Sequence, residues 1–229
     1  MQPTSASVHI YLEIGKRRTF AGAVDWPGWC RSGEDEYSAM QALCGYGARY
    51  AAILQAAQIE FQPPANPQDF VVFERLVGNA TTDFGAPNMP LTSDERPLNE
   101  EEFIRLQGLL MACWQGLDVA VLGAANRELR KGPRGGGRDL VGILEHLMGS
   151  DASDLARLAS PFQVRSGESI EQELGRTRQA MLNALARAVQ GDLPSVGPRG
   201  GVIWPARRFV RSIAWHCLDH TWEIEDRLE

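Results

Sequence analysis

The sequence predicts a chain of two parts, an α+β domain over residues 1–98 followed by an all-α four-helix bundle over residues 99–229. Short segments rich in β-branched and aromatic residues occur in the first part, whereas long helix-forming segments follow Asn99. Prolines are concentrated within residues 87–97, where the composition changes, and they indicate a linker. These observations predict two domains with their boundary at about residue 98.

The first part is predicted to begin with a β-hairpin. Residues 8–14 and 19–24 favour β-structure, and residues 15–17 form the turn between them. Trp26 and Trp29 follow in a second turn, where we expect both rings to be exposed or half-buried.

A helix and further strands complete the predicted first part. The acidic residues that begin at Glu34 suit the positive end of a helix, which we expect over residues 34–57. Residues 70–77 form the next predicted strand, and residues 81–87 are predicted as a short strand and turn.

The segment from Phe20 to Gly33, Phe-Ala-Gly-Ala-Val-Asp-Trp-Pro-Gly-Trp-Cys-Arg-Ser-Gly, leads into an acidic helix start and an alanine-rich helix. This pattern resembles the small β-β-β-α domain of HicB-like antitoxins, here within residues 8–90. In that family the domain pairs with a small RNA-cleaving toxin, so the resemblance implies a module that binds a protein partner. The DNA-binding segment that usually accompanies the module is not recognisable in this sequence.

The second part is predicted as four helices with Gly- and Pro-rich connections. Asn99 before three glutamates is a good N-cap, Asp139 is a second, and Ser169 with Gln172 forms a capping box. Pro205 is suited to open the last helix. Helices of this length predict a four-helix bundle, with its members over residues 101–130, 139–158, 169–190 and 205–228.

The last predicted helix carries His216 and His220. Positions four apart lie on one helix face, so both imidazoles can point at one metal ion. A catalytic zinc-type site generally uses three protein ligands and leaves a position open for water or substrate. Of the two other histidines, His9 lies in a predicted strand and His146 in a predicted helix, which makes His146 the better third ligand.

A histidine on the second bundle helix, followed by His-x-x-x-His on the last helix, resembles the DinB/YfiT-like family over residues 99–229. The resemblance implies a four-helix bundle that binds a divalent metal, usually zinc or nickel, through His146, His216 and His220. It also implies open coordination positions and, by analogy with some relatives, transfer of low-molecular-weight thiols or thiol-dependent isomerisation of small substrates. A homodimer formed through the helices is a further expectation from this resemblance.

Three other residues are candidates for roles near this site. Glu223 follows His220 by three positions and lies on the ligand face of the helix, where it would accept a hydrogen bond from a ligating histidine or be a fourth ligand. The alternative for Glu223 is a solvated or salt-bridged carboxylate. Arg134 and Arg199 lie in the two Gly-Pro-Arg-Gly-Gly segments and are candidates to bind a substrate carboxylate at the mouth of a cleft.

Charge and hydropathy limit the classes of partner. The net charge of −6 argues against a nucleic-acid-binding surface, which needs a concentrated positive field. No apolar run reaches the ~20 residues that cross a bilayer, and the polar start lacks a secretory signal. We therefore expect a cytoplasmic protein without membrane contact, whose scattered cysteines are reduced.

Two hypotheses of different class follow. In the first, the chain is a divalent-metal-binding protein of the DinB type that acts on a small molecule, as a metal-dependent thiol transferase or isomerase, or as a hydrolase. In the second, it is a non-catalytic interaction protein whose HicB-like domain binds a protein partner and whose bundle is a scaffold.

Overall fold

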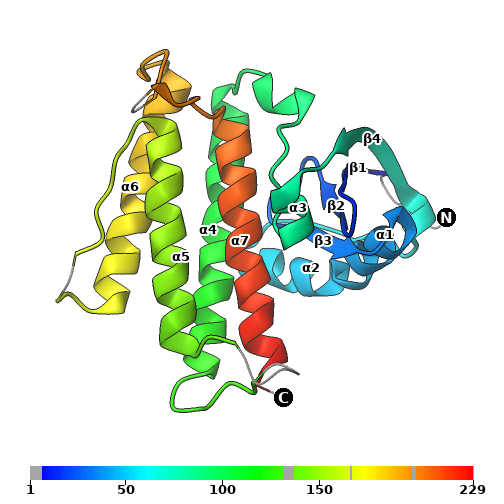
Figure 1. Cartoon of the computed structure of the whole chain (residues 1–229), viewed down its shortest axis with the longest axis horizontal. Coiled ribbons are helices and arrows are strands. Elements are labelled where there is room, and N and C mark those ends of the chain that lie inside the picture. Colours follow the sequence, from blue (N-terminus) through cyan, green and yellow to red (C-terminus); the bar gives the residue numbers. More distant parts are fainter. Residues whose placement is uncertain (1–6, 132–136, 166, 198–199, 229) are drawn as a thin grey trace.

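The computed structural model describes residues 7–131, 137–165, 167–197 and 200–228. Figure 1 shows a sheet part with short helices beside a helical part in which long helices lie side by side. The predicted fold class, an N-terminal α+β part followed by an all-helical region, is confirmed.

Four strands form one mixed sheet in the order β3-β2-β1-β4. Strands β1 (Val8–Ile14) and β2 (Thr19–Ala23) pair antiparallel, which confirms the predicted hairpin. Strand β3 (Cys30–Gly33) pairs antiparallel with β2, and the predicted strand β4 (Phe70–Val77) lies parallel to β1. Because parallel strands need a crossover connection, the helices between β3 and β4 pack onto the sheet.

The single helix predicted over residues 34–57 is wrong, because the segment forms two helices. They are α1 (Glu36–Gly45) and α2 (Gly47–Ala56). A Cβ atom on Gly47 would lie only 2.6 Å from the Cβ of Pro63, so the glycine allows the following loop to pack against the start of α2. The change of direction brings α2 against the first long helix of the helical part.

The segment over residues 81–87, predicted as a strand and turn, also has a different structure. It begins with the short helix α3 (Ala80–Phe84), which is capped by Asn79. The Asn79 side chain accepts hydrogen bonds from the backbone N–H groups of Thr81 and Thr82. The capping signal Asn-x-x-Thr was present in the sequence, but the two β-branched threonines favoured a strand.

Trp29, expected to be at least half-exposed, is completely buried, whereas Trp26 is half-buried. The Trp29 ring stacks on Tyr50, and its Nε1 donates a hydrogen bond to the backbone oxygen of Leu43 at 2.9 Å. A buried indole needs such a partner for its N–H group. Trp29 therefore belongs to the core between the sheet and its helices.

Three of the four long helices begin at the predicted caps. Asn99, Asp139 and Ser169 each accept a hydrogen bond from a backbone N–H three residues later. The first helix ends before residue 130, and the positive φ of 60° at Asn126 excludes a continuous helix there. The long helices are α4 (Glu100–Gly123), α5 (Leu140–Leu155), α6 (Ile170–Gln190) and α7 (Ala206–Asp226).

Helix α7 connects the two parts. It packs on α4 and α5 on the bundle side and on the 3₁₀ turn η2 (Thr92–Glu95), which follows α3, on the other (Figure 1). One continuous hydrophobic cluster contains Leu12 and Trp29 of the sheet part and Leu110, Phe209 and Trp222 of the helical part.

The chain just after α3 is fixed between the sheet and α7. Glu13, a completely buried carboxylate on β1, accepts hydrogen bonds from the backbone N–H groups of Asn88 and Met89 at 3.0 Å. From the other side, Arg208 and Arg211 of α7 donate to the backbone oxygens of the same two residues, at 2.9 and 3.2 Å. These contacts hold the segment beside α7.

Helix α4 is long and apolar enough, by length and composition, to cross a membrane. The core helix of a soluble protein passes the same test, and α4 buries Leu109, Leu110 and Cys113 completely. Packing against α7 and α2 accounts for this buried face, whereas Ile104, Met111, Val119 and Leu122 of the same helix are exposed.

A buried acid on α5 makes the stability depend on pH. Burial, with a smaller contribution from the neighbouring Asp154, raises the pKa of the Asp151 carboxyl from 3.8 to about 8. Between these two pKa values the folded chain holds a proton that the unfolded chain releases, so stability falls as pH rises through this window.

We expect Asp151→Asn to raise the free energy of unfolding by up to roughly 5 kcal/mol at about pH 8, at ~1.4 kcal/mol for each unit of the pKa shift, and to have little effect at about pH 4. Urea unfolding at a series of pH values would measure this. The exposed Asp192→Asn is the matched control and should leave the pH profile unchanged. Equal profiles for Asp151→Asn and the unmodified chain would contradict the prediction.

Candidate metal centre

Three histidines meet between α5 and α7. His146 comes from α5, and His216 and His220 come from successive turns of α7. The His146 ring centroid lies 5.0 Å from that of His216 and 5.1 Å from that of His220, and the last two are 4.8 Å apart. The structure thus brings together the three residues that the sequence singled out.

The local sequence explains why these rings face one another. On α5, Ile143 and Leu147 flank His146 and are buried in the core, which orients this face of the helix toward α7. On α7, the spacing of four residues places His216 and His220 one above the other. Each side of the site is therefore set by the packing of an amphipathic helix.

The spacing of the nitrogens fits one metal ion. One ligand nitrogen from each of the three rings lies within 4.8 Å of the other two, and the Nε2 atoms of His146 and His216 are 3.1 Å apart. Two nitrogens bound to the same tetrahedral zinc ion would be about 3.3 Å apart at ordinary bond lengths. The spacing of His146 and His216 therefore already suits one ion, and imidazole suits zinc, nickel, copper and iron.

The electrostatic environment keeps two of the rings neutral. Burial, together with the smaller effects of the neighbouring rings and Arg138, lowers the pKa of His216 from 6.5 to about 3. Burial also lowers the pKa of His146, with a second contribution from the positive charge of Arg138. A metal ion binds only an unprotonated ring nitrogen, so these two ligands are ready to bind at neutral pH.

Glu223 orients the third histidine of the cluster. Its Oε2 atom lies 2.7 Å from Nδ1 of His220, and its Oε1 accepts a hydrogen bond from Arg227 at 2.7 Å. The hydrogen bond from His220 is the main cause that lowers the pKa of the Glu223 carboxyl. When Nδ1 of His220 donates this bond, Nε2 is left with its lone pair toward the other two histidines.

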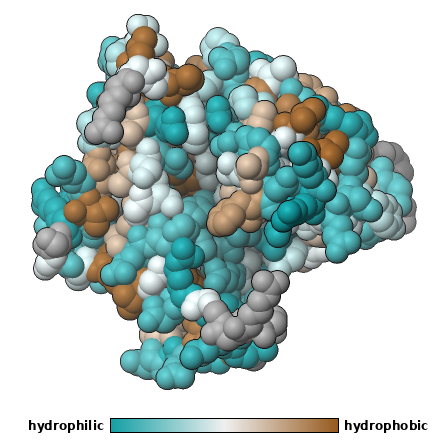
Figure 2. All heavy atoms as spheres, viewed as in Figure 1, coloured by the Kyte–Doolittle hydropathy of each residue, from teal (hydrophilic) through white to brown (hydrophobic). Residues whose placement is uncertain are grey.

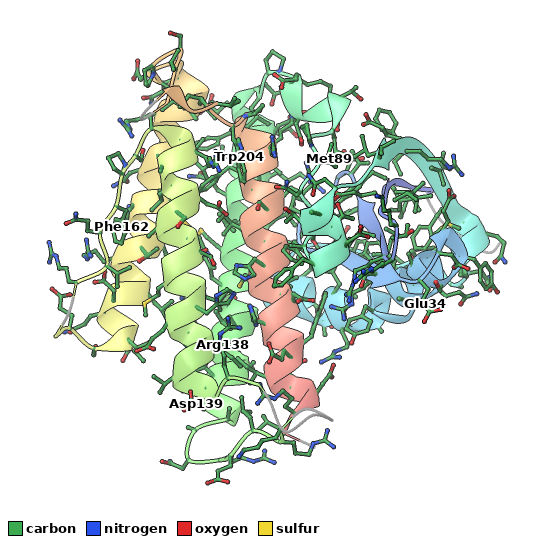
Figure 3. All side chains as sticks on the ribbon, in the orientation of Figure 1. Glu34, Met89, Arg138, Asp139, Phe162 and Trp204 are labelled. Atoms are coloured by element: carbon green, nitrogen blue, oxygen red, sulfur yellow. The ribbon has the colours of Figure 1, made fainter. Side chains whose placement is uncertain are left out.

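The histidines line an open cleft of about 630 Å³. Its walls are α5, α7 and the segment from α3 to Asn88, so the sheet part contributes one side. In Figure 3, Trp204 lies at the upper end of the region between α5 and α7, and Arg138 lies lower down between the same two helices, above Asp139. A second cavity of about 730 Å³ lies on the sheet part beside His9 and Trp26, and no group of metal ligands within the described residues lies there.

The other candidates have different outcomes. Arg134 and Arg199 lie outside the described residues. Asp219, next to His220 in sequence, lines the cleft and forms an ion pair with Arg31 of β3 at 2.9 Å.

Sequence reasoning did not find the contribution of α3, because only the tertiary arrangement brings that segment to the cleft. Asp154, which lies in the cleft near the end of α5, was also missed.

Comparisons of the chain with models of protein families, with curated proteins and with solved structures gave no match.

Proposed function

We propose that this chain is a metal-dependent enzyme of the DinB/YfiT type, which binds a divalent ion through His146, His216 and His220 and acts on a small molecule in the adjoining cleft. The observation that carries the proposal is the convergence of three ring nitrogens on the wall of an open cleft. Purely structural histidines have no need of such an opening. Zinc or nickel is the expected ion.

The residues of the chain have distinct roles in this proposal. His146, His216 and His220 hold the ion, and Glu223 fixes the orientation of His220. Trp215 stacks on His216 with 5.8 Å between ring centroids and limits the rotation of that ligand. When bound, a divalent ion lowers the pKa of a water molecule or thiol that reaches it and so supplies a nucleophile at neutral pH.

Thiol transfer or isomerisation is the reaction we favour, by the resemblance to the DinB/YfiT-like family, and hydrolysis is the alternative within the same site. The cleft has room for both a thiol and a second substrate, since ligand pockets start at about 300 Å³. The HicB-like part would act here as a wall of the cleft.

The chain also fits the second hypothesis, an interaction protein, in one respect. Val71, Phe73 and Val77 are exposed on the edge strand β4, and Figure 2 shows hydrophobic surface over the sheet part at the upper right. An exposed apolar edge strand is a common place for a protein partner to bind. The metal experiment below separates the two hypotheses.

Cobalt substitution tests the proposed enzyme. Protein purified without added metal is loaded with Co²⁺, whose visible absorption reports the ligand number, and a low-molecular-weight thiol is then added. We expect one ion per chain and a new sulfur-to-cobalt absorption band, because three histidines leave a position open. Stoichiometric binding without a thiol band would exclude thiol chemistry, and the absence of binding would favour the scaffold.

We expect Glu223→Gln to reduce zinc affinity roughly 10–100-fold, because the loss of the carboxylate weakens the hydrogen bond that orients His220. Competition with a chromophoric chelator would measure the affinity. Glu225→Gln is the matched control, since Glu225 lies on the same helix and pairs with Arg49. An equal affinity in both variants would show that Glu223 only stabilises the helix end.

A further inference from the structure

Asp154 is a half-buried carboxylate near the end of α5, and it lines the same cleft as the histidines. Burial raises its pKa from 3.8 to about 6, so it is mostly ionised at neutral pH. No hydrogen bond or ion pair of its side chain occurs within the part of the chain that the structure describes. An ionised acceptor partly removed from water and left without a donor is costly, and a ligand in the cleft can supply that donor.

The nearest cations are engaged elsewhere. The Arg208 guanidinium lies over the ring of Trp204 at 4.4 Å from its centroid and donates to the backbone oxygen of Asn88. The Arg157 guanidinium lies 5.5 Å from the centroid of the same ring. Both lower the pKa of Asp154 through their charge, but neither forms an ion pair with it at 4.0 Å or less within the described residues.

The separation of His146 and Asp154 along α5 sets the length of a ligand that reaches both. Asp154 follows His146 by eight residues, which corresponds to about 12 Å along the helix axis. Ser150 lies between these two residues on α5, and Trp215 and Phe84 line the same cleft with apolar side chains. Phe84 of α3 is 89% exposed, so a ligand beside it would shield an apolar ring from water.

We propose that the cleft takes an elongated small molecule that carries a primary amine, with its ammonium group on Asp154, its apolar middle against Trp215 and Phe84, and its other end at the three histidines. This inference rests on the proposed function, because the metal fixes one end of the molecule. An ammonium group offers three charged donors to the carboxylate that lacks one.

The test uses two series of straight-chain hydroxamic acids, one ending in a primary amine and one in a methyl group, with graded lengths. Their dissociation constants are measured by calorimetry on the zinc-loaded full chain, on Asp154→Asn and on Asp192→Asn. Asp192 is exposed after α6, so its variant makes the same charge change away from the cleft. The metal content and the melting temperature of Asp154→Asn are measured first. Neither should decrease, because the substitution removes a charge that has no partner within the described residues.

We expect the amine to tighten binding at least ~10-fold in the unmodified chain and in Asp192→Asn, with an optimum chain length, and to give no gain in Asp154→Asn. Equal dissociation constants for the two series, or an amine gain that persists in Asp154→Asn, would overturn the inference while the metal site stands. If the chain binds no zinc, the proposed function fails. In that case the inference is tested alone, by following with NMR how a long-chain alkylamine binds to the metal-free chain. The inference stands if this binding depends on Asp154 and fails if it does not.

Discussion

His216→Ala is expected to lower the affinity for zinc more than ~100-fold, since even the loss of a residue that only orients a ligand costs 10–100-fold. The His216 ring is held against Trp215, and its Nε2 lies 3.1 Å from that of His146. Two remaining histidines cannot complete the usual three-ligand site. The measurement is the metal content of protein purified without added metal, together with a zinc titration.

His9→Ala is the matched control for this experiment. His9 is the remaining histidine of the chain, lies exposed on β1 and contacts Phe73. Its variant should keep one ion per chain, and zinc should raise its melting temperature as it does for the unmodified chain, because a ligand that binds only the folded state stabilises it. Equal metal contents of His216→Ala and His9→Ala would remove the basis of the proposed enzyme.

The histidine cluster was predictable because it depends on local rules. Helical spacing alone places His216 and His220 on one face, and the caps at Asn99, Asp139 and Ser169 predict where three of the helices begin. With four histidines in the chain, the choice of His146 as the third member needed only the prediction that residues 139–158 form a helix.

The surroundings of the site were not predictable in this way. The cleft wall formed by α3 depends on Glu13, which lies far from Asn88 in sequence yet accepts a hydrogen bond from its backbone N–H. Burial of Trp29 likewise depends on Tyr50, a residue of another element. Long-range contacts of this kind leave no periodic pattern in the sequence, so propensity rules gave a strand at residues 81–87 and an exposed ring at Trp29.

Breaking the buried ion pair between Asp94 and Arg211 is expected to destabilise the fold by about 3–5 kcal/mol. Asp94 of η2 and Arg211 of α7 are 3% and 8% exposed, and their closest atoms are 2.5 Å apart. Asp94→Ala leaves a guanidinium without its carboxylate in the interface that joins the two parts of the chain. Urea unfolding of the metal-free protein would measure the loss.

A double variant that also replaces Arg211 separates the cost of an unpaired charge from the contribution of the ion pair itself. In Asp94→Ala with Arg211→Met no charge is left buried, so we expect the double variant to recover most of the stability. Glu168→Ala is the control, because the Arg165–Glu168 pair is exposed and should contribute less than about 1 kcal/mol. A double variant as unstable as Asp94→Ala would instead mean that the pair holds η2 against α7 by specific hydrogen bonds. The segment that Arg211 fixes at Met89 would then move, and the cleft would lose the wall next to the histidines.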